Sequence, residues 1–189
     1  VYAGGYLYGV KDAGAAADAA QMTVETVNVA LDGGKASGNV FGGAHTRQYG
    51  NANVDSVAIA VTGGTHGRVY GGGWAEGNSV NSVDEATITI SGGYVDYVYG
   101  GGANGEGYTT VGNSTITISG NAEVGTIFMS GRYGQSSVTG TVSLTFSGAE
   151  KTIKRLSGVS SAGIDNAAST IVTLETIVNA DRIDFVDEF

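Results

Sequence analysis

The chain has 189 residues, a formal net charge of −9 and only nine Lys and Arg residues. That balance argues against a phosphate-binding surface, so DNA and RNA are not expected partners, because nucleic-acid affinity comes mainly from Lys and Arg. The absence of cysteine excludes disulfides, thiolate metal sites and a cysteine nucleophile. No apolar run reaches the roughly 18 residues of a membrane-spanning helix, and the length is that of one domain.

The N-terminal residues already belong to a repeat. Val1-Tyr2-Ala3-Gly4-Gly5 copies a phrase that starts again at Val40, 39 residues later and ten more than the later stride of 29. The alanine-rich segment near residues 11–22 is therefore expected to be an insertion between turns. Because the chain starts without Met and within the repeat, we expect it to be part of a longer protein.

A strand-like segment recurs five times along the chain, at residues 27–34, 57–64, 86–93, 114–121 and 142–148. Aliphatic residues alternate with Thr, Ser, Ala or Asn, which is the period-two pattern of a half-buried strand. The alternation predicts a row of inward side chains, listed in chain order: Val29, Leu31, Ile59, Val61, Ile88, Ile90, Ile116, Ile118, Leu144 and Phe146.

A second phrase, typically Val-aromatic-Gly-Gly, follows each strand-like segment. Its copies start at Val40, Val69, Val98, Ile127 and Leu156, each 29 residues after the last. Such a period is typical of solenoids and propellers. Two strands per unit are too few for a propeller blade and no hairpin signature joins them, so we expect a coil of parallel strands.

The repeat weakens toward the C-terminus. Leu174 follows Phe146 by 28 residues, which predicts one more core strand. We therefore divide the chain into a repeat region, residues 1–160, and a last turn with a C-terminal cap, residues 161–189. A cap is expected because an open solenoid end leaves strand edges unpaired.

Two of these phrases carry a resemblance. Thr-Ile-Thr-Ile-Ser-Gly-Gly at residues 87–93, followed by Val-Tyr-Gly-Gly-Gly at residues 98–102, resembles repeats of bacterial cell-surface and autotransporter-like adhesins. The resemblance spans about residues 24–160. It implies an all-β fold, a right-handed parallel β-helix of about six turns with a repeat near 29 residues, and an extracellular or cell-surface location.

One residue of each phrase predicts an aromatic row: Phe41, Tyr70, Tyr99 and Phe128. Internal stacking is the favoured interpretation, since stacked rows fill the core of a coil. The alternative is an exposed strip on which sugar rings stack.

A second row, five residues after each phrase start, holds His45, Trp74, Ala103 and Arg132, whose identities vary as on a solvent-facing surface. Trp74, the only tryptophan, is the best candidate for a contact residue. Polar connections around it supply further candidates. The full set of candidate ligand contacts is His45, Trp74, Glu76, Asn78, Tyr108 and Arg132.

These features predict a non-catalytic surface domain that acts in adhesion or as a stalk, without cofactor or metal. Its partner would be a host glycan, a protein or another copy of itself. The first alternative is a polysaccharide lyase or glycoside hydrolase fragment, for which Asp96 and Glu123 are the candidate carboxylates. A remote alternative is ice binding through the Thr-x-Thr rows at 87–89 and 115–117.

Overall fold

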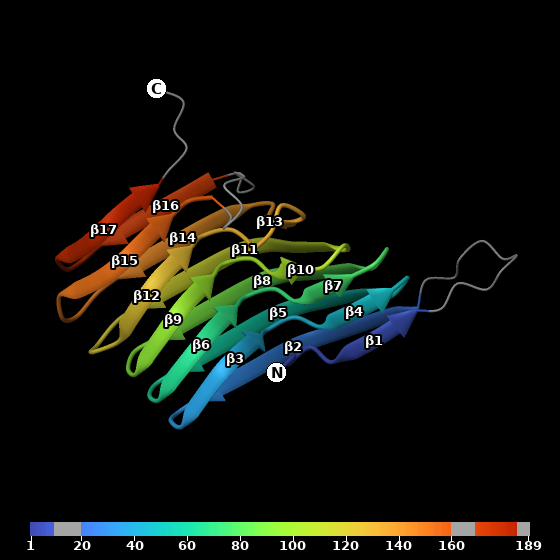
Figure 1. Ribbon diagram of the computed structural model, residues 1–189, viewed down its shortest axis with the longest axis horizontal. Helices are drawn as coiled ribbons and strands as arrows, with labels where there is room; N and C mark the ends of the chain where they lie inside the picture. Colours follow the sequence, from blue (N-terminus) through green and yellow to red (C-terminus); the bar gives the residue numbers. More distant parts are fainter. Residues whose placement is uncertain (10–19, 160–168, 185–189) are drawn as a thin grey trace, which may run out of the picture.

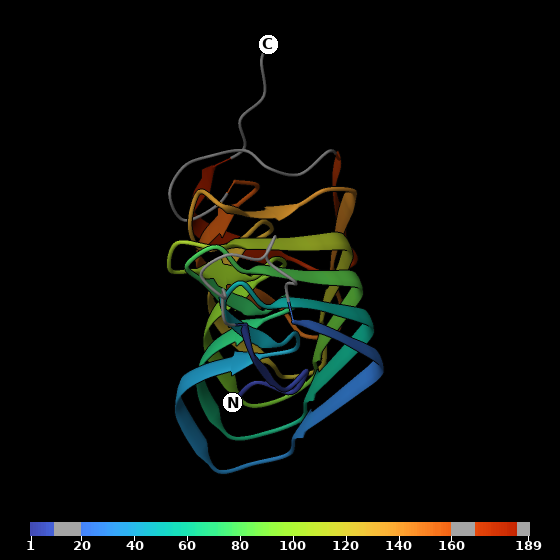
Figure 2. The same ribbon diagram turned by 90° about the vertical axis from the view of Figure 1, so that its right-hand side faces the viewer.

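The computed structural model describes residues 1–9, 20–159 and 169–184 of the chain. Within these residues all regular structure is β, and every strand pairing is parallel. The chain winds into a β-solenoid of about five turns with a repeat near 29 residues. The windings rise from the blue N-terminal strands to the red C-terminal strands (Figure 1) and lie one above another when turned (Figure 2). The predicted parallel coil is confirmed, with about five turns where about six were expected.

Three parallel sheets form the walls of the coil. Sheet A consists of β3 (Lys35–Phe41), β6 (Thr65–Tyr70), β9 (Tyr94–Tyr99), β12 (Glu123–Phe128), β15 (Lys151–Ser157) and β17 (Val178–Asp184). Sheet B consists of β1 (Tyr6–Gly9), β4 (His45–Gln48), β7 (Trp74–Glu76) and β10 (Ala103–Asn104). Sheet C consists of β2 (Gln21–Leu31), β5 (Asn51–Val61), β8 (Val80–Ile90), β11 (Tyr108–Ile118), β14 (Thr141–Phe146) and β16 (Ser169–Leu174), with β13 (Ser136–Val138) beside β11.

Sheet B was not predicted. The segments after each Val-aromatic-Gly-Gly phrase were expected to be polar connections, yet Trp74 and Glu76 lie in β7, which pairs with β4 and β10. These strands have two to four residues, too few for the period-two pattern to be visible in the sequence. Each of the early windings therefore has three strands, not two.

The predicted inward rows form the main core. Ile59 pairs with Ile88, Ile88 with Ile116 and Ile116 with Leu144, and all four are buried. Val29, in the first winding, is only partly buried, and among the described residues its strand β2 has a neighbouring strand on one side alone. Equivalent residues of successive windings thus stack in register, as the repeat predicts.

Glycines of the phrase allow the corner between sheets A and B to be tight. A Cβ at Gly71 would lie 2.6 Å from the carbonyl oxygen of Gly100 and 2.9 Å from the Ala86 side chain. Gly64, at the turn before β6, has a φ of +83°, a conformation that other residues rarely adopt. Close contacts at Gly71 and the positive φ of Gly64 therefore explain why glycine recurs at these two positions of the repeat.

Buried polar side chains hold the inner corner between sheets B and C. The Asn81 amide Nδ2 donates to the carbonyl oxygen of Ala44 at 2.9 Å, and the Ser79 hydroxyl donates to that of Thr46 at 3.0 Å. Two windings later, the Thr109 and Ser136 hydroxyls lie 2.6 Å apart in a hydrogen bond. These bonds satisfy backbone and side-chain groups that burial would otherwise leave unpaired.

The last winding pairs in register with the winding before it, but its apolar side chains are exposed. Leu174 pairs with Phe146 as predicted, and Ile183 pairs with Leu156, yet Leu174 and Ile183 are each 61% exposed. Among the described residues, no strand pairs with the far side of β16 or β17. The cap within residues 161–189 stays a prediction.

Two further expectations concern segments that the structure describes only in part. The insertion near residues 11–22 falls mostly outside them, and its last two residues, Gln21 and Met22, belong to β2. In the part of the chain that the structure describes, no helix is long and apolar enough to cross a membrane.

Candidate functional site

The aromatic row is a continuous buried stack. Ring centroids of Phe41 and Tyr70 lie 4.4 Å apart, those of Tyr70 and Tyr99 4.5 Å, and those of Tyr99 and Phe128 5.1 Å, with nearly parallel planes. All four side chains are at most 4% exposed. Tyr2 extends the stack onto Phe41 at 4.9 Å. The internal interpretation is confirmed, and an exposed strip of these rings is excluded.

This aromatic ladder, Tyr2, Phe41, Tyr70, Tyr99 and Phe128, lies outside the main core. In sheet A it alternates with the inward row that contains Val69, and its rings form a separate cluster. The ladder occupies the outer corner where the chain turns from sheet A into sheet B. Side chains on both sheets cover it, and they make this corner the most varied surface of the solenoid.

On the sheet B side, the register of the predicted second row is confirmed, but Ala103 is buried rather than solvent-facing. Tyr6, His45, Trp74 and Ala103 are successive partners across β1, β4, β7 and β10. The backbone N–H of Arg132 donates to Gly102 at 2.9 Å and continues the row. Variation of side chains at a fixed backbone position therefore sets the chemistry of this surface.

Glu76 joins three of its neighbours through one carboxylate. Its Oε1 accepts the indole N–H of Trp74 at 2.8 Å and lies 3.1 Å from Nε2 of His45. The guanidinium Nε of Arg47 lies 2.7 Å from its Oε2. Trp74 meets Phe41 edge to face at 6.0 Å, so the partly exposed indole has a fixed orientation against the ladder.

The protonation states of this cluster follow from its surroundings. Partial burial lowers the pKa of the His45 imidazole and outweighs the neighbouring Glu76 carboxylate. A neutral His45 can thus donate its Nε2 proton to Glu76. Burial raises the pKa of Glu76, but the hydrogen bonds from Trp74 and His45, together with the charge of Arg47, lower it in sum. At neutral pH the carboxylate is ionised and accepts all three contacts.

Arg132, in the winding after that of Ala103, contacts the ladder at Tyr70. Its Nη1 lies 3.5 Å from the Tyr70 hydroxyl, and its guanidinium is 4.9 Å from the centre of the Tyr133 ring. Tyr133 in turn meets Trp74 edge to face at 6.4 Å. Burial, aided by Tyr99, raises the pKa of the Tyr70 phenol above its usual range, so this hydroxyl is neutral. Arg132 and Trp74 therefore belong to one surface.

Two predicted contact residues lie elsewhere. Asn78 is exposed in the turn after β7, and Tyr108 is 55% exposed at the start of β11 in sheet C, where it pairs with Val80. The structure brings together His45, Trp74, Glu76 and Arg132. It does not bring Asn78 or Tyr108 into their hydrogen-bonded and ring-contact network.

Sequence reasoning missed the sheet A side of the ladder. Arg68, Tyr97, Thr126 and Arg155 form one row across β6, β9, β12 and β15. Arg68 lies 5.4 Å from the Tyr97 ring centre and Arg155 lies 5.0 Å from that of Phe128. Arg68, Tyr97 and Thr126 each stand two residues before a ladder residue, so their constant spacing was visible in the sequence.

We call this surface the A–B face. Its floor is the aromatic ladder, and partly or fully exposed side chains stand on both sides of that floor. They are Tyr6, His45, Trp74, Arg132 and Tyr133 on the sheet B side and Arg68, Tyr97 and Arg155 on the sheet A side.

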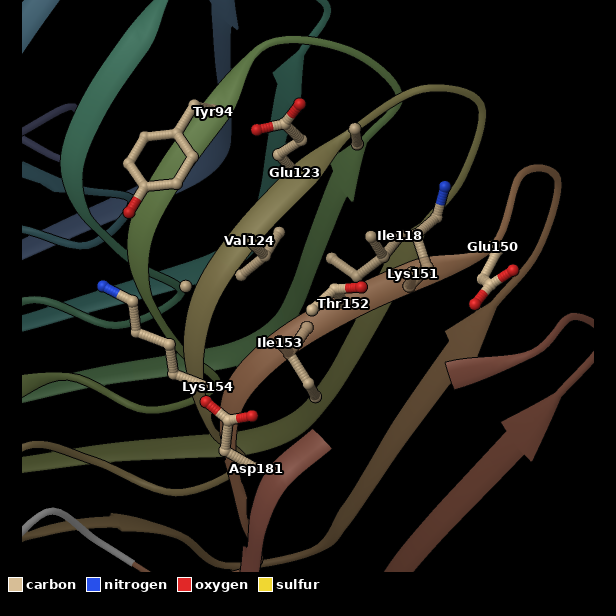
Figure 3. Close-up of a pocket in the computed structure, with 12 residues that line it drawn as sticks. Tyr94, Ile118, Glu123, Val124, Glu150, Lys151, Thr152, Ile153, Lys154 and Asp181 are labelled. Atoms are coloured by element: carbon tan, nitrogen blue, oxygen red, sulfur yellow. The ribbon is translucent and has the colours of Figure 1, made fainter. Parts of the chain in front are cut away.

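A pocket of about 420 Å³ lies between β12 and β15, where these strands pair only over their C-terminal halves. Ile118, Val124 and Ile153 line it, and Glu123, Glu150 and Asp181 stand around its rim rather than together (Figure 3).

The carboxylates around the pocket do not form a recognisable acid-base pair, and neither do the two candidate catalytic carboxylates, Asp96 and Glu123. Asp96 accepts the Tyr94 hydroxyl at 3.1 Å, and Glu123 lies opposite Tyr94 in the next strand. Among the described residues, no group of three or more His, Asp and Glu side chains is placed to hold a metal ion.

Comparisons with known proteins found no matching family model, no matching curated protein and no matching solved structure.

Proposed function

We propose that this chain is a non-catalytic β-solenoid domain of a secreted or cell-surface protein, acting in adhesion, with the A–B face as its contact surface and a glycan as its ligand. The rest of the coil serves as a rigid support. The single observation that carries the proposal is the fixed, partly exposed Trp74 indole, held by Glu76 and packed against a buried aromatic ladder.

Pre-orientation of this kind favours binding. An aromatic side chain that is already immobilised loses little conformational entropy when a ligand packs on it. Trp, Tyr and Arg, which are enriched in binding hot spots, are the residues that surround the ladder. Sugar rings present apolar C–H faces that pack on such rings, and their hydroxyls accept and donate hydrogen bonds to the neighbouring polar groups.

The proposal is tested on a glycan array with the wild type, Trp74→Ala and a matched control, Tyr108→Ala. Both substitutions remove one exposed aromatic ring, but Tyr108 lies on sheet C, away from the ladder. We expect Trp74→Ala to lose the glycan signal and Tyr108→Ala to keep it. Equal signals from wild type and Trp74→Ala would reject Trp74 as a contact, and an empty array would reject glycan binding.

The enzymatic alternative has its own test. The chain is incubated with acidic and neutral polysaccharides, and new reducing or unsaturated ends are measured. The proposal predicts no release above buffer. Turnover that disappears in Asp96→Ala or Glu123→Ala would instead make the chain a carbohydrate-active enzyme.

A further inference from the structure

The positive charges of this acidic chain are segregated. The strands of sheet C contain no Lys or Arg but carry four carboxylates, those of Glu25, Asp55, Asp84 and Glu85. All five arginines of the chain lie instead on or beside sheets A and B: Arg47, Arg68, Arg132, Arg155 and Arg182. A chain with a net charge of −9 thus gathers its guanidinium groups on one side.

Three of these arginines stand directly on the A–B face. Arg68, Arg132 and Arg155 each place a guanidinium about 5 Å from an aromatic ring centre, within the range of cation–π contacts. At Arg68, the guanidinium stacked on the Tyr97 ring keeps the N–H donors of its edge available for an anion. Among the described residues Arg68 has no carboxylate partner, whereas Arg155 is paired with Asp184 at 2.6 Å.

The arginines are spaced along the solenoid axis. Arg68 and Arg155 belong to one row and are three windings apart, roughly 14 Å at the usual strand spacing of about 4.8 Å. Arg132 lies across the ladder from them, against Tyr70. Arg68 and Arg155 therefore lie on one side of the buried rings, and Arg132 lies on the other.

We infer that the ligand of the A–B face is an acidic polysaccharide, bearing carboxylate or sulfate groups, which lies along the axis with its anions on Arg68 and Arg132. The inference rests on the proposed function and adds the class of glycan. Guanidinium groups recognise carboxylate and sulfate through paired hydrogen bonds, and Trp74, Tyr97 and Tyr133 supply apolar ring surface between them.

A polymer with a regular repeat fits this surface better than a folded acidic protein. Phe41, Tyr70, Tyr99 and Phe128 are at most 4% exposed, so the floor that they form offers no cavity for a protein side chain to fill. Arg68 and Arg132 instead stand on opposite sides of this floor, so a linear chain that lies along it can reach both.

The experiment measures the affinity of the full chain for four immobilised probes of similar length: a polyuronate, a sulfated glycosaminoglycan, neutral dextran and poly-glutamate. The variants are Arg68→Gln, Arg132→Gln and the conservative Arg68→Lys. The matched control is Lys35→Gln, which removes a cation at the exposed start of β3, outside the A–B face. The melting temperature of every variant is recorded, so that loss of fold is not mistaken for loss of binding.

We expect binding to the two acidic polysaccharides that weakens as salt is added, because salt screens exposed charges. Arg68→Gln and Arg132→Gln should each weaken it roughly tenfold, as expected for a lost charge-assisted hydrogen bond. Lys35→Gln should leave it unchanged, and Arg68→Lys should retain part of it.

The remaining outcomes overturn the inference in distinguishable ways. Equal binding to dextran would keep the proposed glycan function but reject the acidic class. Binding to poly-glutamate alone would make the partner an acidic protein. No binding to any polysaccharide would reject the proposed function as well, and unchanged affinity in both Arg→Gln variants would remove these arginines from the site.

Discussion

The outer side of sheet C and the A–B face are built on the same repeat but differ in chemistry. On sheet C the outward rows of the middle windings keep small side chains: Thr87 pairs with Thr115, and Thr89 with Thr117, while the strands carry no cation. On the A–B face the equivalent rows change residue from winding to winding, as from His45 to Trp74. Side chains that keep the repeat stabilise the strands, whereas positions that vary between windings can form a binding surface.

The comparison also bears on ice binding. The Thr rows are in register on neighbouring strands, but Ala58 and Asn28 replace Thr in the earlier windings and Ile171 follows Ser143 in the last. Thr is favoured in strands for its shape, so the rows need no ligand. Thermal hysteresis of the chain should equal that of an inert protein at the same concentration.

The largest effect is expected from a substitution in the main core, which supports both surfaces. Ile116→Asp places a carboxylate at a fully buried position between Ile88 and Leu144, and an unpaired buried charge costs several kcal/mol. We expect the variant not to fold, as judged by circular dichroism. Thr115→Asp, the exposed neighbour, is the control, and a cooperative wild-type-like melt of Ile116→Asp would mean that this row does not face the core.

The second largest effect on stability is expected from a substitution under the A–B face alone. Tyr70→Ala removes the middle of the aromatic ladder and should cost about 3 to 5 kcal/mol of unfolding free energy, as for other large buried rings. Tyr70→Phe keeps the stack and loses only the hydroxyl near Arg132, so its cost should be small. Urea denaturation measures both, and equal costs would show that the hydroxyl, not stacking, matters.

Acid should act on the A–B face through His45 and Glu76. The folded-state pKa of His45 is below its ordinary value of 6.5, so the unfolded chain binds a proton first and stability falls as the pH drops through 6.5. The folded-state pKa of Glu76 is below 4.5, so its stabilisation is present above pH 4.5 and is lost as the pH falls through the lowered value.

Melting temperatures measured from pH 7.5 down to below the ordinary Glu pKa test this sign. His45→Gln should flatten the profile in its upper part and Glu76→Gln in its lower part. Profiles that stay parallel to the wild type would show that the cluster does not couple folding to protons.

The smallest effect is expected on sheet C. Thr87→Ser keeps the hydroxyl and removes one exposed methyl group, so its unfolding free energy should stay within about 0.5 kcal/mol of the wild type. A larger loss in urea denaturation would mean that the outer rows of sheet C stabilise the coil through their methyl groups.

The sequence predicts the coil and its inward rows because both depend on period-two alternation repeated at a fixed stride. Ile88 and Ile116 could be placed against each other from spacing alone. Sheet B could not, since β7 and β10 are too short to show alternation and their identity depends on pairing with β4. Glu76 was a candidate for its nearness to Trp74 in sequence, but its link to His45 crosses windings and needed coordinates.

The most direct test of the account is nuclear magnetic resonance of the labelled chain during titration with an acidic oligosaccharide. We predict that shifts move for the amides of His45, Trp74, Arg68 and Arg132, on the A–B face, while those of Thr87 and Thr115 on sheet C stay in place. Shift changes confined to sheet C, or none at saturating ligand, would contradict a binding face built on the aromatic ladder.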